Sequence, residues 1–95
     1  MNRQTYPTEQ QLEDIKNFPI KSLGDCEKLL DCIEDMWSYQ DWGWDKTPAS
    51  GQYFISTAGW SGNEDIIQAM QKNVMFWALC WQESRRGGHY KFCVK

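Results

Sequence analysis

The sequence predicts an α+β fold of order α-α-β-α-β-β, in which helices cover one face of a small three-stranded, mostly antiparallel sheet. Two observations favour this class. Apolar residues recur at helical spacing through the first forty residues, and aromatic or β-branched runs between turn residues follow in the second half. A chain of 95 residues is too short to divide its core, so we expect a single domain, 1–95. Six tryptophans, four tyrosines and four phenylalanines are available to make that core dense.

The helical half of the chain is expected at residues 8–39. Thr8 and Gln11 match the N-cap and N3 positions of a capping box, and Pro19 ends the first helix because the residue before proline avoids the α region. A second helix is expected from about Leu23 to Tyr39. Its apolar residues lie three and four positions apart, at Cys26, Leu29, Leu30, Ile33, Met36 and Trp37.

Residues 40–51 are expected to form a loop, because the segment QDWGWDKTPASG is rich in Gly, Pro, Asp and Ser. A β-α-β-β half, residues 52–94, follows. It begins with a strand at Tyr53–Thr57, a run that is mostly aromatic or β-branched. Ser61 and Glu64 then match a second capping box, and they open a helix that ends near Asn73.

The apolar run Val74–Trp81 fits either a buried strand or a continued helix. We favour a central strand, because turn residues at Arg85–Gly88 and a strand-like run at His89–Val94 follow it. A four-residue hairpin loop would pair residues across the two strands. The expected pairs are Ser84 with His89, Trp81 with Phe92, Leu79 with Val94 and Cys80 with Cys93.

Cysteine usage and hydropathy indicate the cellular setting. The four cysteines form no C-x-x-C pair, so their spacing predicts reduced thiols, and we expect no metal and no other cofactor. Residues 1–11 are polar, and no apolar run approaches the ~18 residues of a membrane-spanning helix. These features predict a cytoplasmic protein without membrane contact.

An acidic, tryptophan-containing surface is the first candidate site. Residues 1–50 hold ten acidic and five basic residues, whereas residues 51–95 hold three and five. Tryptophan is frequent at interface hot spots, and acidic side chains steer a basic partner, so a host protein is the expected partner. Direct nucleic-acid binding is not expected, because the carboxylates would repel phosphates. A loop with two tryptophans either presents them or is pinned to the core by them, and both remain open. The candidate partner-binding residues are Trp42, Trp44, Asp41, Asp45, Glu34 and Asp35.

A small anion is the second candidate ligand. Glycines let the strand-to-helix junction at residues 59–62 approach a ligand closely, and free N–H groups at a helix N-terminus attract anions. Two arginines at a hairpin tip, beside an imidazole and a phenol, are suited to gripping a phosphate. The candidate ligand-binding residues are Trp60, Ser61, Gly62, Asn63, Arg85, Arg86, His89 and Tyr90. Two simpler interpretations compete: Ser61 and Glu64 cap their own helix, and the arginines are solvated turn residues.

No motif of an enzyme is present. The chain has one histidine and lacks G-x-S-x-G, P-loop and G-x-G-x-x-G patterns, so we assign no catalytic residue and favour a protein that is not an enzyme.

The second half of the chain resembles a family of small phage and prophage proteins without an assigned activity. The resemblance is carried by the run Gly59–Glu64 (GWSGNE), by Phe76-Trp77 and Cys80-Trp81, and by the run Ser84–Tyr90 (SRRGGHY). It implies a phage setting, in which small accessory proteins commonly bind and block a host protein, immune effectors included.

The leading hypothesis is therefore a non-enzymatic protein-binding module, a phage-encoded inhibitor of a host defence or nucleic-acid-processing protein. The alternative is a module for a nucleotide or other small anion, which would use the Trp60–Asn63 turn with Arg85 and Arg86. A self-associating structural component is a third possibility.

Overall fold

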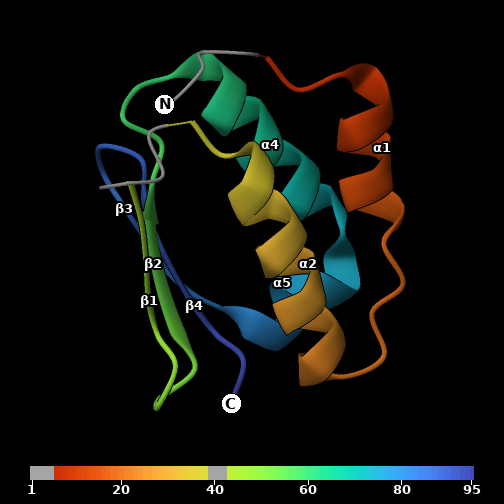
Figure 1. Cartoon of the computed structure of the whole chain (residues 1–95), viewed down its shortest axis with the longest axis vertical. Coiled ribbons are helices and arrows are strands. Elements are labelled where there is room, and N and C mark those ends of the chain that lie inside the picture. The colour runs from red at the N-terminus through yellow and green to blue at the C-terminus, as the bar shows by residue number, and fades with distance from the viewer. Residues whose placement is uncertain (1–5, 39–42) are drawn as a thin grey trace.

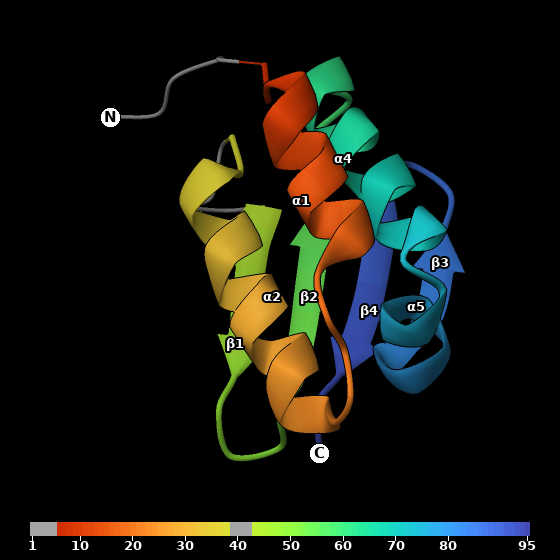
Figure 2. The same cartoon turned by 90° about the vertical axis from the view of Figure 1, so that its right-hand side faces the viewer.

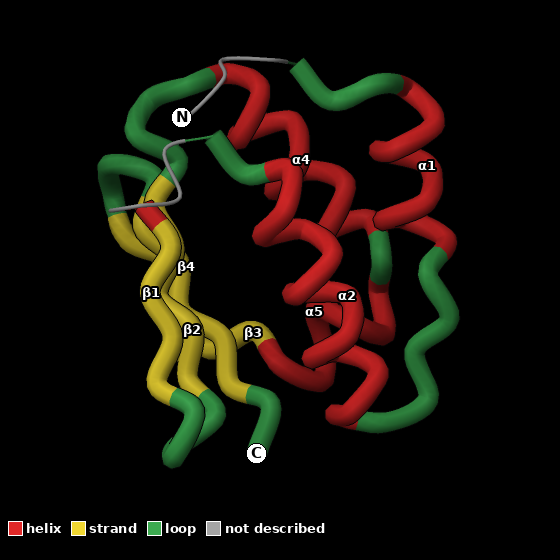
Figure 3. The backbone as a smooth tube through the Cα atoms, viewed as in Figure 1, coloured by secondary structure: helices red, strands yellow, loops and turns green. Residues whose placement is uncertain are grey.

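A computed structural model describes residues 6–38 and 43–95, and it has the predicted α+β class in two layers (Figure 1). The strands form one antiparallel sheet of order β1-β2-β4-β3, and the helices lie on one of its faces, as Figure 3 shows most simply. Within the described residues the order is α-α-β-β-α-α-β-β, which has one strand and one helix more than predicted. The elements are α1 (Glu9–Asn17), α2 (Leu23–Met36), β1 (Trp44–Thr47), β2 (Gln52–Ser56), α4 (Ser61–Lys72), α5 (Val74–Cys80), β3 (Trp81–Arg85) and β4 (His89–Cys93).

The first capping box is confirmed. Gln11 donates its backbone N–H to the Thr8 hydroxyl at 3.0 Å, and Thr8 donates its own N–H to the Gln11 side chain at 2.8 Å. Helix α1 packs against α4, and it lies farther from the sheet than α4 does (Figure 2). Among the described residues, none of the helices has the length and apolar character of a transmembrane segment.

The core lies between the helices and the inner face of the sheet. Alternation along the two central strands turns Tyr53 and Ile55 of β2 and Phe92 of β4 toward the helices, where all three are buried. The helices contribute the apolar stripe predicted for α2 and a second stripe from α4. The fully buried side chains from the helices include Leu29, Leu30, Ile33, Ile66, Met70 and Phe76.

The expectation of one long loop over residues 40–51 is wrong, because strand β1 occupies Trp44–Thr47 and pairs with β2. Only its first side chain, Trp44, is buried, so the strand shows no apolar alternation that the sequence could reveal. Short, charged strands of this kind are typical of sheet edges. The turn residues at 48–51 form the hairpin between β1 and β2, where Gly51 adopts a φ of +67°.

The preference for a strand over residues 74–81 is also wrong. The alternative helix is correct for Val74–Cys80, and Trp81 begins β3 directly after it. Asn73 starts the helix by accepting the Phe76 backbone N–H on its side-chain oxygen at 3.2 Å, and its amide donates to the carbonyls at the end of α1. Helical spacing then buries Phe76 and Cys80 together.

The hairpin exists, but its register differs from the prediction. The turn has three residues, so His89 faces Arg85 and Tyr90 faces Ser84, which corrects the expected Ser84–His89 pair. Trp81 does face Phe92, because a bulge between Trp81 and Glu83 restores the predicted alignment. The Leu79–Val94 and Cys80–Cys93 pairs do not form, since residues 79 and 80 are helical.

One buried amide connects three segments. Asn63 of α4 accepts the Ser38 N–H at 3.0 Å and donates to the Ser38 carbonyl at 2.9 Å and to the Thr57 carbonyl at 3.3 Å. The Asn63 side chain is fully buried, so water cannot take its place as the hydrogen-bond partner of these backbone groups. Asn63 thus fixes the end of α2, the end of β2 and the start of α4 relative to one another.

We predict that Asn63→Ala lowers the free energy of unfolding by about 3 kcal/mol, since it removes three hydrogen bonds that a buried side chain makes to the backbone. Urea unfolding followed by tryptophan fluorescence measures the change. Gln68→Ala on the exposed face of the same helix is the matched control, with an expected change below about 0.5 kcal/mol. Equal effects of the two substitutions would contradict this role of Asn63.

The four cysteines are free thiols in different environments. Burial raises the pKa of the Cys26 and Cys80 thiols, whereas Cys32 is exposed and Cys93 is half-buried. We predict that a disulfide reagent at about pH 8 modifies Cys32 first and reaches Cys26 and Cys80 only after unfolding. Cys32→Ser should remove the fast phase. Reaction of all four thiols at one rate in the native protein would contradict the prediction.

Candidate functional site

Side chains of the protein itself cover the first turn of α4. Ser61 is the first residue of the helix, so the expected capping box is wrong: Trp60 holds the N-cap position, without a side-chain hydrogen bond. The Ser61 hydroxyl instead bonds the Tyr6 hydroxyl at 2.8 Å, and the Tyr6 and Trp60 rings lie 4.6 Å apart. The Trp60 indole also covers Gly62, where an added Cβ would lie 2.7 Å from its nitrogen. Gly62 and Asn63 are both buried and have structural contacts.

The hairpin tip packs against the connection between β2 and α4. Gly87 and Gly88 have φ values of +89° and +77°, as the predicted turn requires. The Gly88 carbonyl accepts the Thr57 N–H at 2.9 Å, and a Cβ at Gly88 would lie 2.1 Å from the Thr57 hydroxyl. The close approach of these two backbones therefore requires glycine at position 88.

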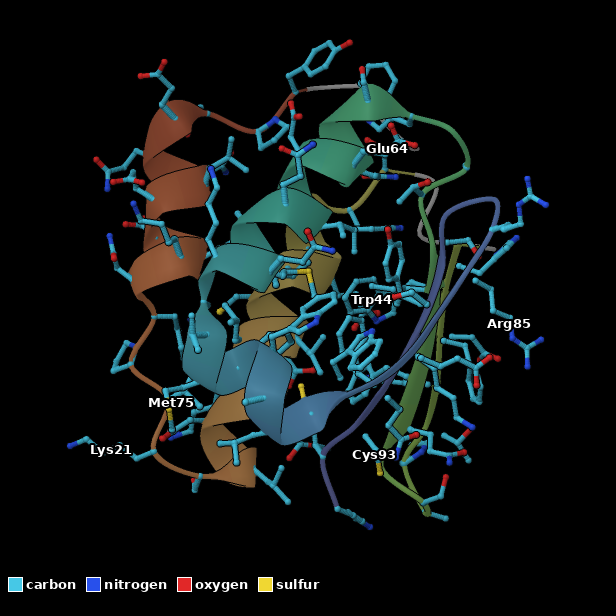
Figure 4. All side chains as sticks on the ribbon, turned by 180° about the vertical axis from the view of Figure 1, so that it is seen from behind. Lys21, Trp44, Glu64, Met75, Arg85 and Cys93 are labelled. Atoms are coloured by element: carbon cyan, nitrogen blue, oxygen red, sulfur yellow. The ribbon has the colours of Figure 1, made fainter. Side chains whose placement is uncertain are left out.

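The two predicted ligand patches are neighbours, but they do not form one site. Thr57 lies between them, and its hydroxyl donates to the Glu64 carboxylate at 3.4 Å. No hydrogen bond or ion pair within the described residues joins Arg85 or Arg86 to residues 60–63. Arg85 instead points away from the helices, on the far side of the sheet from α4 (Figure 4).

The predicted partner-binding residues are divided among several environments. Trp44 is a core residue: its ring packs edge-on against Trp37 at 5.4 Å, and Figure 4 places it between the sheet and the helices. Glu34 forms an ion pair with Lys46 at 3.5 Å, and Asp35 and Asp45 are exposed. Asp41 and Trp42 lie outside the described residues. The structure thus resolves the open question about Trp44 in favour of burial.

Side chains on the outer face of the sheet form two cross-strand rows. The first row joins Asp45, Phe54, Lys91 and Glu83 through the pairings of all four strands. The second row joins Ser56, His89 and Arg85, and the Ser56 hydroxyl is 2.7 Å from His89 Nδ1. Sequence analysis found Arg85 and His89, but missed their neighbours because the facing of each residue depends on the strand register.

An exposed apolar surface lies where helix α5 joins the edge strand β3. Helix α5 and the first residue of β3 leave large apolar side chains in solvent: Val74 is 72% exposed, Met75 53%, Leu79 41% and Trp81 40%. The Trp81 ring stacks on Trp77 at 5.8 Å, and its indole nitrogen donates to the Ser84 hydroxyl at 2.9 Å. We call these four residues the α5–β3 surface.

Comparisons with protein-family models, with curated proteins and with solved structures found no match.

The acidic face of α2 affects one buried phenol. Burial, reinforced by the carboxylates of Asp31, Glu27 and Glu34, raises the pKa of Tyr53 to about 12. In the unfolded chain the phenol ionises near its ordinary pKa of about 10. The stability that neutral Tyr53 contributes is therefore complete below about pH 10 and is lost as the pH rises toward 12.

We predict that, as the pH rises from about 10 to 12, the free energy of unfolding falls more steeply for the wild-type protein than for Tyr53→Phe. Urea unfolding of both proteins across this range provides the comparison, because lysine titration is common to both. Parallel pH profiles would show that Tyr53 ionises alike in the folded and unfolded states.

Proposed function

We propose that the chain is a non-enzymatic protein-binding module and that the α5–β3 surface is its main contact. The observation that carries this proposal is the exposure of Val74, Met75, Leu79 and Trp81, which lie on one short helix and on the first residue of the strand that follows it. Burying a side chain of this size on a partner contributes roughly 1.5–3 kcal/mol. Contiguous exposed apolar residues are typical of protein–protein contact sites.

The geometry of α5 explains why this surface faces outward. The helix turns Phe76 and Cys80 into the core, and helical spacing then directs residues 74, 75, 78 and 79 away from it. No described element covers that face. The fold therefore keeps several apolar side chains in water, although turning them inward would favour folding.

Trp81 has the features of an anchoring residue. Its stacking on Trp77 and its hydrogen bond to Ser84 hold the indole in one orientation before a partner arrives. A side chain that is already ordered loses less entropy on binding, and tryptophan is enriched among hot spots.

The partner that we propose is a host protein with an apolar groove. The resemblance to phage proteins supports this setting, in which the module would act in the host cytosol by covering a surface that a defence or nucleic-acid-processing protein needs. The exposed carboxylates of α2 and β1, including Asp35 and Asp45, would add attraction for basic residues beside that groove.

The test is capture from host lysate with the wild-type chain and with a Met75→Lys, Leu79→Lys double variant. Both positions are exposed, so the variant should keep its circular dichroism spectrum and its unfolding midpoint. We predict that a protein retained by the wild type is lost by the variant, with a fall in affinity of at least about tenfold.

Gln71→Lys, on the exposed side of α4, is the matched control and should retain the same protein. Equal retention by wild type and double variant would overturn the assignment of the α5–β3 surface. Sedimentation of the wild type separates the remaining possibility: a dimer that the double variant abolishes would assign the surface to self-association instead.

A further inference from the structure

We infer that the outer face of the sheet holds a second site, which binds a small anion carrying a planar ring. A depression of about 410 Å³ lies on this face, between β2, β4 and β3. Its volume falls in the usual range for small-molecule sites, roughly 300–1,000 Å³. The outward side chains that line it are Phe54, Ser56, Glu83, Arg85, His89 and Lys91.

Two cations flank this depression. Arg85 faces His89 across the β3–β4 pair, and Lys91 lies two residues farther along β4, so the two cations are diagonal neighbours whose Cα atoms are about 7–8 Å apart. Glu83 accepts a hydrogen bond from Arg85 Nε, which orients the guanidinium and leaves its terminal amino groups to bind a ligand. Those amino groups have the geometry for a phosphate or carboxylate.

The imidazole between them is held in place. The Ser56 hydroxyl is hydrogen-bonded to His89 Nδ1, and this bond holds the ring against β2. Nε2 is therefore the nitrogen that can bind a ligand. His89 is the only histidine of the chain. Arg85 and His89 lie opposite each other in the strand register, so one anionic group can meet both.

Phe54 supplies an apolar wall beside the cations. Phe54 is 41% exposed on this face of the sheet, and Lys91 Nζ lies over one side of its ring, 5.4 Å from the centroid. An aromatic ring of a ligand can stack on Phe54 while its anionic group reaches Arg85 and His89.

The first cross-strand row, which contains Phe54, has an acidic residue at each end, and these charges favour a small ligand over a nucleic-acid strand. Asp45 lies beyond Phe54 on β1, and Glu83 lies beyond Lys91 on β3. A phosphate backbone that crossed the sheet would meet these carboxylates, whereas a single anion at Arg85 and His89 meets only one of them. We therefore assign the site to a ligand of the size of a nucleoside monophosphate.

This site is separate from the α5–β3 surface. In Figure 4, Arg85 lies on the outer side of the sheet, and Met75 lies on the opposite side of the molecule, among the helices. The two proposals can therefore fail or succeed independently.

The test is an NMR titration of the ¹⁵N-labelled full chain with adenosine monophosphate. We expect amide shifts along β2, β4 and β3, with weaker responses to adenosine and to inorganic phosphate, because each lacks half of the ligand. The Arg85→Gln, Lys91→Gln variant should bind at least about tenfold more weakly. Arg86→Gln removes a neighbouring turn cation outside the depression, so it is the matched control and should bind as the wild type does.

The outcomes decide between the ligand classes. No shift at millimolar nucleotide, or equal loss in the double variant and in Arg86→Gln, would overturn the site. Affinity that rises steeply with the length of an oligothymidine would assign the face to single-stranded nucleic acid and would also overturn it. The Met75→Lys, Leu79→Lys variant should keep nucleotide binding whether or not it captures a protein, which distinguishes this test from that of the proposed function.

Discussion

The hydrogen bonds of the Asn63 side chain are the constraint on which the rest of the arrangement depends. This amide joins Ser38, after α2, to Thr57, after β2, and does so from the first turn of α4. Thr57 in turn binds the backbone of Gly88 at the hairpin tip. A series of hydrogen bonds therefore runs from the helical layer to the β3–β4 hairpin, which carries Arg85 and His89. The residue has this role because a buried amide must satisfy both its donors and its acceptor.

The sequence predicts those elements whose signals are local. The capping pair Thr8 and Gln11, the helical stripe of α2, and the aromatic and β-branched run of β2 all lie within one element, and the structure has each of them near its expected bounds. Strand β1 could not be found in this way, because it has four residues and a single buried side chain. The run Val74–Trp81 contains a helix and the start of a strand without an intervening loop, so no single periodicity describes it.

The candidate sites likewise contain some residues that the sequence alone identifies and others that depend on contacts between distant segments. The sequence predicts Arg85 and His89 as ligand-binding residues because their side chains are polar and lie beside a predicted turn, and the structure places them opposite each other. Phe54 and Lys91 join them only through the pairing of β2 with β4, which depends on contacts distant in sequence. Asn63 looked like part of a ligand-binding turn, yet its burial gives it a structural role. A polar residue beside glycines is compatible with both roles until its surroundings are known.

The bulge in β3 lets one short strand contribute to two different surfaces. In a regular strand, residues 81, 83 and 85 would share one face, because side chains alternate with a period of two. Gln82 is the extra residue between the Trp81–Phe92 and Glu83–Lys91 pairs, so Trp81 turns toward the helices while Glu83 and Arg85 turn outward. Deleting Gln82 alone would remove the bulge and leave a regular strand in which Trp81 directly precedes Glu83, so the indole would still face the helices and the guanidinium would still face outward. The bulge thus keeps Trp81 and Arg85 on opposite faces although they lie four residues apart in sequence, so the proposed partner and the proposed ligand would contact different sides of the same strand.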